Sequence, residues 1–274
     1  MNGDPPAAAT GPVTRERLAA KKRAGQPITM LTAYDATLAR TVDAAGVDCI
    51  LVGDSLGNVI QGRASTVPVT LDDMAYHTAC VRRGVERALV IADLPFLSYT
   101  DVASAVASAR RVMQAGAAMV KLEGGAPVFD AVERLTALGV PVCGHLGLTP
   151  QAVHQLSGYK VQARDRDARR RLLDEARGLE QRGAAMLVLE CVPSSLAAEV
   201  AEALAIPVIG IGAGVDVDGQ VLVLHDALGL GGERRPRFVR DFMADAGSIP
   251  AAIEAFVAAV RDGSFPDARE AYGD

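Results

Sequence analysis

The sequence alternates short apolar runs with segments of helical periodicity, and this alternation occurs eight times along the chain. Each run has the length of a strand and is apolar on both faces, which is typical of parallel strands covered by helices. Eight such units are what a closed (β/α)8 barrel requires, although a doubly wound open sheet is also compatible with the pattern. We therefore predict an α/β barrel, with strands at 28–33, 49–54, 88–93, 119–123, 140–144, 186–190, 207–212 and 221–224.

Three of the intervening segments have clear helical signatures, at 101–115, 169–182 and 249–261. Gly116 and Gly183 directly follow the first two, at positions where glycine commonly ends a helix. The run 164–177 is rich in both acidic and basic residues. Such a run is typical of a solvated helix face with ion pairs, so we do not interpret it as a basic helix that recognises nucleic acid.

The composition favours one domain that acts on small molecules. The 274 residues are 50% hydrophobic, and their number falls within the usual size of a single α/β barrel. A net charge of −5 gives no general attraction to nucleic acid or to anionic membranes, and no apolar run reaches the roughly 18 residues that span a bilayer. We predict a disordered tail at 1–12, a single barrel domain at 13–274 and, because the tail lacks the apolar core of a signal peptide, a cytoplasmic protein.

Several common cofactor motifs are missing from the sequence. The cysteines are far apart and lack the CxxC spacing of zinc or redox sites, so we interpret all four as ordinary thiols: Cys49, Cys80, Cys143 and Cys191. Three of them lie in or beside apolar runs, where free cysteine commonly behaves as a small buried apolar residue. The segment GIGAG at 210–214 does not fit the dinucleotide fingerprint GxGxxG, which argues against a nicotinamide cofactor. The pair His225 and Asp226 has no serine or cysteine beside it in the sequence, so we assign it a structural role.

Ionisable residues interrupt the apolar runs at the C-terminal ends of five successive predicted strands. In a parallel barrel these ends face the mouth of the active site. Buried acids need a counterion, and Mg²⁺ favours oxygen ligands, so Asp54, Asp93 and Glu123 are the candidate metal ligands. The alternative is that each acid caps the following helix. The residues at these strand ends are Asp54, Ser55, Asp93, Lys121, Glu123, His145 and Glu190.

Seven sequence blocks together resemble the ketopantoate hydroxymethyltransferase family, and they run in order over nearly the whole chain. The blocks are VGDSLG (52–57), STVPVTLDDMAYHT (65–78), IADLPF (91–96), VKLEGG (120–125), VPVCGHLGLTPQ (140–151), LVLECVP (187–193) and IPVIGIGAG (206–214), the last followed by DGQVLVLHD (218–226). The departures are small: VQAR at 161–164 stands where the family usually has VQGR, and Asn58 stands where a Met is common.

The resemblance implies a TIM barrel of the phosphoenolpyruvate/pyruvate type. It implies transfer of a hydroxymethyl group from 5,10-methylenetetrahydrofolate to 3-methyl-2-oxobutanoate, giving 2-dehydropantoate for pantothenate synthesis, by a homo-oligomer that is commonly a decamer. Carried onto this sequence, it makes Asp54, Asp93 and Glu123 ligands of Mg²⁺ and Glu190 the proton acceptor. It also places Ser55 and Lys121 against the oxo acid.

The mechanism that we expect proceeds through an enolate of the oxo acid, stabilised by Mg²⁺ that chelates its ketone and one carboxylate oxygen. Glu190, desolvated at the end of an apolar strand, should have a raised pKa suited to removing a proton from carbon. Substrate contacts are expected from Asp54, Ser55, Asp93, Lys121 and His145, although a structural role for the histidine is almost as compatible.

Three alternatives stay open on the sequence. Lys121 could form a Schiff base with the oxo acid, although the neighbouring Glu123 favours the protonated amine. A related metal-dependent lyase that cleaves a C–C bond of a 2-hydroxy acid would use a similar barrel, but the resemblance implies a KKCGH-like loop for such lyases, and this chain lacks it. A non-enzymatic binding protein would follow if the acids were only helix caps.

Overall fold

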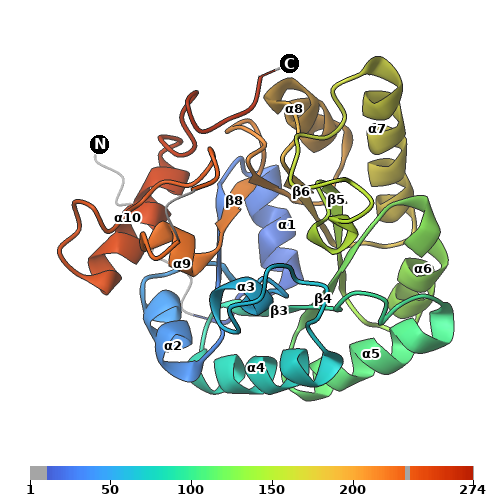
Figure 1. Cartoon of the computed structure of the whole chain (residues 1–274), viewed down its shortest axis with the longest axis horizontal. Helices are drawn as coiled ribbons and strands as arrows, with labels where there is room; N and C mark the ends of the chain where they lie inside the picture. Colours follow the sequence, from blue (N-terminus) through green and yellow to red (C-terminus); the bar gives the residue numbers. More distant parts are fainter. Residues whose placement is uncertain (1–10, 232–234, 274) are drawn as a thin grey trace, which may run out of the picture.

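The computed structural model describes residues 11–231 and 235–273 and shows a closed barrel of eight parallel strands (Figure 1). The strands follow one another around the barrel in chain order, and β8 pairs with β1 to close it. The prediction of a closed barrel is thus confirmed, and the open-sheet alternative is excluded. The strands are β1 (Ile28–Thr32), β2 (Cys49–Val52), β3 (Leu89–Asp93), β4 (Met119–Glu123), β5 (Val142–Gly147), β6 (Met186–Glu190), β7 (Val208–Ile211) and β8 (Gly219–Leu222).

Two of the eight predicted strands start two residues away from the predicted position, and β2 ends at Val52, two residues before the predicted Asp54. β5 starts at Val142 because the Val140 N–H bonds to the Leu135 carbonyl at the end of the preceding helix, and the strand then continues through His145 to Gly147. The last strand starts two residues earlier than predicted, at Gly219, where the chain packs so tightly on β1 that an added Cβ would lie 2.2 Å from the Ile28 carbonyl oxygen. The hydrophobic pattern missed this start because it begins with glycine and glutamine.

Capping side chains and glycines mark the ends of the helices. The predicted helix at 101–115 is α5, capped by Asp101, whose carboxylate accepts the Ser104 N–H at 2.8 Å. Gly116 then turns the chain with φ +115°. The helices are α1 (Arg15–Arg23), α2 (Ala36–Ala44), α3 (Leu56–Val59), α4 (Leu71–Gly84), α5 (Val102–Gln114), α6 (Phe129–Ala137), α7 (Arg166–Gln181), α8 (Ser194–Ala203), α9 (Leu224–Ala227) and α10 (Ile249–Arg261), with short 3₁₀ turns η1 (Ala126–Val128) and η2 (Pro150–Ala152).

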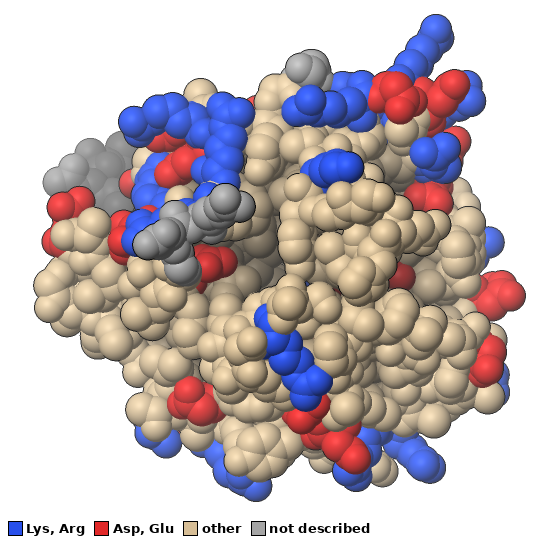
Figure 2. All heavy atoms as spheres, in the orientation of Figure 1, with Lys and Arg blue, Asp and Glu red and all other residues tan. Residues whose placement is uncertain are grey.

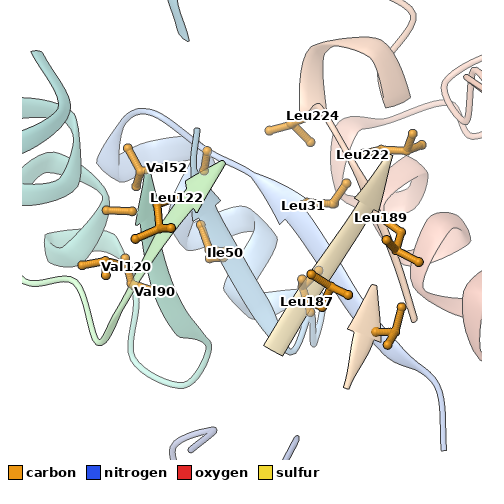
Figure 3. Close-up of a cluster of buried hydrophobic side chains, with 14 of the residues drawn as sticks. Leu31, Ile50, Val52, Val90, Val120, Leu122, Leu187, Leu189, Leu222 and Leu224 are labelled. Carbon is orange, nitrogen blue, oxygen red and sulfur yellow. The ribbon is translucent and has the colours of Figure 1, made fainter. Parts of the chain in front are cut away.

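Alternate residues of each strand enter two different packing layers. One set points outward and packs against the helices; Figure 3 shows part of it, including Leu31, Val90 and Leu187. The other set fills the barrel interior: Ile28, Met30, Cys49, Leu51, Leu89, Ile91, Met119, Cys143, Met186, Val188, Ile209 and Val221. Polar residues therefore reach the interior only where the strands approach their C-terminal ends.

Helix α1 closes the N-terminal end of the barrel. Leu18 is buried with the interior cluster, and the Lys21 and Lys22 ammonium groups lie 2.6 and 2.7 Å from the carboxylates of Asp48 and Asp218. These two acids precede β2 and β8, at the end of the barrel opposite the predicted site. Only the C-terminal end is therefore left for a cavity.

No helix in the described part of the chain is both long and apolar enough to cross a membrane. Residues 1–10 of the predicted N-terminal tail lie outside the described residues.

Candidate active site

A cavity of about 400 Å³ lies at the C-terminal end of the barrel, and all seven site residues predicted from the sequence line it. The two-residue strand period explains their convergence, because Asp93, Lys121 and Glu123 continue the inward-facing positions of β3 and β4. His145 and Glu190 do the same on β5 and β6. In the space-filling view the face is hollowed near its middle, and most charged side chains lie toward the rim (Figure 2).

Lys121 is the central cation of the site. Its Nζ lies 2.8 Å from Asp93 Oδ1 and 3.3 Å from His145 Nδ1, and the residue is 4% exposed. Burial alone would lower the pKa of Lys121, but the carboxylates of Asp93, Glu123 and Asp54 outweigh it and raise the pKa above the ordinary value. An amine held protonated in this way is a poor nucleophile, so the geometry argues against a Schiff base.

His145 connects the cation to the acid at the end of β6. Burial, and then the neighbouring charge of Lys121, lower the pKa of His145, so the ring is neutral. Its Nδ1 lies 3.3 Å from Lys121 Nζ and 3.2 Å from Glu123 Oε1, and its Nε2 lies 3.3 Å from Glu190 Oε2. These last two atoms are in contact without the alignment of a regular hydrogen bond. A neutral imidazole thus faces the Glu190 carboxylate.

Glu190 has the environment of a general base. Burial raises the pKa of Glu190, and contact with His145 opposes this only in part. A carboxylate with a raised pKa is a stronger base than an exposed one. Among the ionisable groups that line the cavity, this combination of geometry and pKa suits proton abstraction from a carbon acid.

The three candidate metal ligands lie side by side on one wall of the cavity. The Asp54 N–H donates to Asp93 Oδ2 at 3.0 Å. Burial, and then the Asp93 and Glu123 charges, raise the pKa of Asp54, while burial raises the pKa of Glu123 to about 7. None of the three side chains caps the helix that follows its own strand, so the helix-cap alternative is wrong.

The acid wall matches the chemistry of a hard divalent cation. Among the described residues, Glu123 Oε1 is a buried oxygen that accepts no hydrogen bond, whereas Asp93 Oδ1 is paired with the Lys121 ammonium group at 2.8 Å. A buried oxygen without a donor is costly. In the same part of the chain, no three His, Cys, Asp or Glu side chains form a ready-made metal cluster. Mg²⁺ does not require one, because it typically takes one or two protein carboxylates, retains water and binds substrate oxygens.

Gln151 is the most informative site residue that the sequence interpretation missed. Its amide Nε2 donates to Asp54 Oδ2 and to the Leu94 carbonyl, both at 2.9 Å, and its backbone N–H donates to Glu123 Oε2 at 3.0 Å. The Tyr99 hydroxyl donates to the Gln151 side-chain oxygen. Gln151 thereby binds one oxygen of Asp54 and one oxygen of Glu123, while the other oxygen of Glu123 lies 3.2 Å from His145 Nδ1. It ends the motif GLTPQ, but an amide after a proline gave no signal of this role.

Two further contacts were not predicted. The Tyr34 hydroxyl lies 2.8 Å from Ser55 Oγ, which fixes the serine at the cavity edge. Asp226 lines the cavity, although the sequence interpretation gave the His225 and Asp226 pair only a structural role. His225 packs its ring against Tyr34, with 5.7 Å between ring centroids.

The comparison with known families now decides the relationship. Residues 12–268 match the ketopantoate hydroxymethyltransferase family. The chain belongs to this family. Members include 3-methyl-2-oxobutanoate hydroxymethyltransferase 2 of Pseudomonas aeruginosa, 58% identical over 261 residues, which cover 95% of this chain and 98% of that protein. Another is the 3-methyl-2-oxobutanoate hydroxymethyltransferase of Shewanella amazonensis, 56% identical over 254 residues, which cover 93% and 96% of the two chains.

More distant crystal structures share the fold of this ketopantoate hydroxymethyltransferase family member. A 2,3-dimethylmalate lyase of the PEP mutase/isocitrate lyase superfamily aligns with a TM-score of 0.57 and 19% identity, over 79% of this chain and 82% of that one. Phosphonopyruvate hydrolase, in its complex with oxalate and Mg²⁺, aligns with a TM-score of 0.61 and 13% identity, over 93% and 92%. These similarities confirm the predicted barrel type.

Proposed function

We propose that this protein transfers a hydroxymethyl group from 5,10-methylenetetrahydrofolate to 3-methyl-2-oxobutanoate, producing 2-dehydropantoate. The names of the family members support the reaction class and the oxo acid. The observation that carries the proposal is the pairing of a base and an acid wall in one cavity, which Glu190 lines together with Lys121 and the Asp54, Asp93 and Glu123 carboxylates. A carbon acid must be deprotonated next to a group that stabilises its oxygens, and this cavity offers both.

Substrate binding would use the wall opposite Glu190. Ser55, held by Tyr34, would donate a hydrogen bond to the substrate carboxylate, and the Lys121 ammonium would attract the developing oxyanion. Mg²⁺ held by the Asp54, Asp93 and Glu123 oxygens would supply Lewis acidity at the oxo acid. In this arrangement the oxo acid fills the space between the acid wall and Glu190.

Proton removal would then start the reaction. Glu190 takes the proton from C3, and the neutral His145 beside it stabilises the carboxylate before the transfer. The methylene bridge of the folate opens at one carbon–nitrogen bond to give an iminium, and the enolate carbon bonds to the iminium carbon. The second carbon–nitrogen bond then breaks as water supplies the hydroxyl group, and the two folate nitrogens take up protons, so that tetrahydrofolate leaves. Hydrophobic residues at the mouth, such as Ile211, Val221 and Phe238, keep bulk water from the reacting centre.

A C–C lyase is the second candidate, since a lyase of the same superfamily shares the fold. The sequence interpretation required a reactive cysteine for it. Of the described residues that line the cavity, none is a cysteine, and Cys143 is fully buried inside the barrel, where burial raises the pKa of its thiol to about 12. The transferase is therefore the function that this site supports best.

The test is a single-turnover reaction with 5,10-methylenetetrahydrofolate labelled with ¹³C at the methylene group. We expect the label in the new hydroxymethyl carbon of 2-dehydropantoate, with stoichiometric tetrahydrofolate release. Cleavage of a 2-hydroxy diacid, with no label transferred to the oxo acid, would refute the proposal in favour of the lyase. The predicted homodecamer and the cytoplasmic location are separate proposals, and analytical ultracentrifugation tests the former.

A further inference from the structure

The C-terminal segment completes the start of the helix that follows the proposed base. Helix α8 begins at Ser194, four positions after Glu190, and Pro193 at its N-cap position makes no side-chain hydrogen bond. The first N–H groups of a helix need partners from outside it. Here the Tyr272 carbonyl accepts from the Ser194 N–H at 2.9 Å and from Ser194 Oγ at 3.0 Å.

The Tyr272 side chain lies on the turn between Glu190 and α8. Its hydroxyl and the Cys191 thiol each influence the pKa of the other group, and its ring packs so close to Gly212 that an added Cβ there would lie 3.1 Å from the ring. Cys191 has φ +48°, a left-handed conformation that is unfavourable for a non-glycine residue. Such a residue keeps this conformation only where its surroundings hold it.

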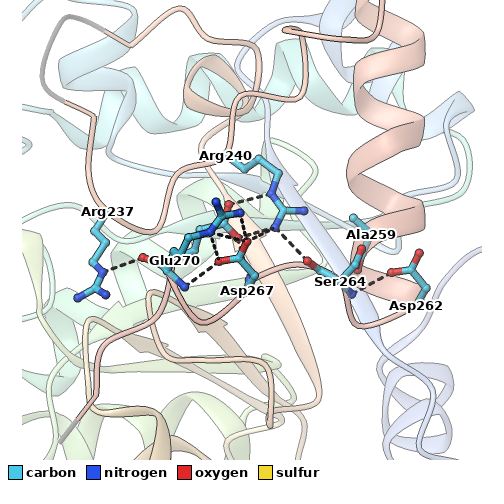
Figure 4. Close-up of polar contacts among 8 residues, drawn as sticks. Arg237, Arg240, Ala259, Asp262, Ser264, Asp267 and Glu270 are labelled. Atoms are coloured by element: carbon cyan, nitrogen blue, oxygen red, sulfur yellow. Dashed lines mark hydrogen bonds and ion pairs between the residues drawn. The ribbon is translucent and has the colours of Figure 1, made fainter.

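Arginine anchors tie the segment that carries Tyr272 to the barrel. We define the C-terminal strap as residues 264–273. Arg240 binds the Glu270 carboxylate through two contacts, Nε to Oε1 at 2.8 Å and a terminal nitrogen to Oε2 at 2.6 Å (Figure 4). Arg237 donates to the Arg269 carbonyl at 2.7 Å. Bidentate arginine pairs fix orientation as well as distance, so the strap approaches α8 in one defined position.

We infer that the C-terminal strap positions the proposed base, with Tyr272 as the positioning residue. By holding Cys191 and the first turn of α8, Tyr272 fixes the direction in which Glu190 leaves β6 and so keeps its carboxylate against His145. Tyr272 does not line the cavity and is not a catalytic residue. The inference rests on the proposed role of Glu190.

The experiment compares a truncation after Glu270 and Tyr272→Phe with the matched control Arg269→Ala. Arg269 lies in the same strap, and its exposed side chain contacts only Asp267 in the described structure. Deuterium exchange at C3 of 3-methyl-2-oxobutanoate gives a maximal rate and a Michaelis constant, and circular dichroism gives the thermal midpoint. We expect the truncation to lower the maximal rate roughly ten- to a hundredfold, because misplacing a catalytic group by about 1 Å has effects of that size.

The Michaelis constant should stay within about twofold, since Ser55, after β2, and Lys121, on β4, which are proposed to bind the oxo acid, make no contact with the strap in the described structure. Tyr272→Phe keeps the backbone carbonyl and the ring and removes only the hydroxyl beside the Cys191 thiol, so we expect a smaller loss, of about fivefold. Arg269→Ala should behave as the native protein.

A native maximal rate in a folded truncation or in Tyr272→Phe would overturn the inference, as would a Michaelis constant that rises with no change in maximal rate. If the truncation does not fold, Tyr272→Phe alone decides. Failure of the proposed function would give a different result. Glu190→Gln would then catalyse exchange at C3 at the native rate, whether or not the strap variants lose activity.

Discussion

The Glu123→Gln variant should stabilise the metal-free protein while weakening its metal site. The replacement has the same shape, and its amide oxygen can still accept the Gln151 N–H, which now donates to Glu123 Oε2 at 3.0 Å. The substitution removes the Glu123 carboxylate, whose ionisation is unfavourable because the group is buried. The effect on stability should therefore depend on pH, in a direction that the structure fixes.

The magnitude follows from the pKa of Glu123, which burial raises from 4.5 to about 7. Between these pH values the folded protein binds more protons than the unfolded chain, so native stability falls as pH rises through this window. At about 1.4 kcal/mol per pH unit, the full difference is about 3 kcal/mol. The free energy of unfolding of Glu123→Gln should not fall with pH in this way. The variant should therefore be about as stable as the native protein at pH 4.5 and more stable by about 3 kcal/mol above pH 7.

Urea unfolding of metal-free protein at pH 5 and pH 8 measures this difference, with Glu199→Gln, a substitution of an exposed acid on α8, as the control. Calorimetric titration with Mg²⁺ should show at least tenfold weaker binding for Glu123→Gln and native binding for the control. A stability difference that is the same at both pH values, or a variant less stable than the native protein at pH 8, would refute the reasoning.

Three other substitutions test separate contacts. Lys121→Met leaves the buried acids without their cation, so the free energy of unfolding measured in urea at pH 8 should fall by about 3–5 kcal/mol. Because we expect no Schiff base at Lys121, native protein treated with the oxo acid and borohydride should gain no mass. Gln151→Leu leaves the Leu94 carbonyl and Asp54 without their donor, so we expect a loss of about 1–3 kcal/mol and weaker Mg²⁺ binding by calorimetry. Gly147→Ala adds a Cβ 2.2 Å from the Glu190 carbonyl oxygen at φ +88°, so C3 exchange should fall more than tenfold; native exchange would contradict this close approach.

The sequence predicted the barrel and the strand-end residues well because both depend on a simple repeat. A parallel strand inside a barrel alternates inward and outward positions, so Asp93, Lys121 and Glu190 could be placed at the mouth from their place in the apolar runs. The same logic failed at the edges of β5 and β8, where a proline, glycines and a glutamine conceal the strand from a hydrophobic pattern.

Contacts made by loops could not be predicted in this way. Gln151 reaches Asp54 across 97 positions of sequence, and Tyr272 reaches Ser194 across 78, so neither leaves a periodic or spacing signal near its partner. Both contacts depend on how segments after the strands fold back over the barrel. The acids could be found from the sequence. Gln151, which binds one oxygen of Asp54 and one of Glu123, could not.

The most direct test of the central claim is NMR detection of deuterium exchange at C3 of 3-methyl-2-oxobutanoate in D₂O, with and without Mg²⁺. The claim is that Glu190 removes this proton next to the acid wall. We predict exchange by the native protein that requires Mg²⁺, is abolished by chelator, and falls at least a hundredfold in Glu190→Gln. No exchange by the native protein with Mg²⁺ and folate present, or native exchange in Glu190→Gln, would contradict the account.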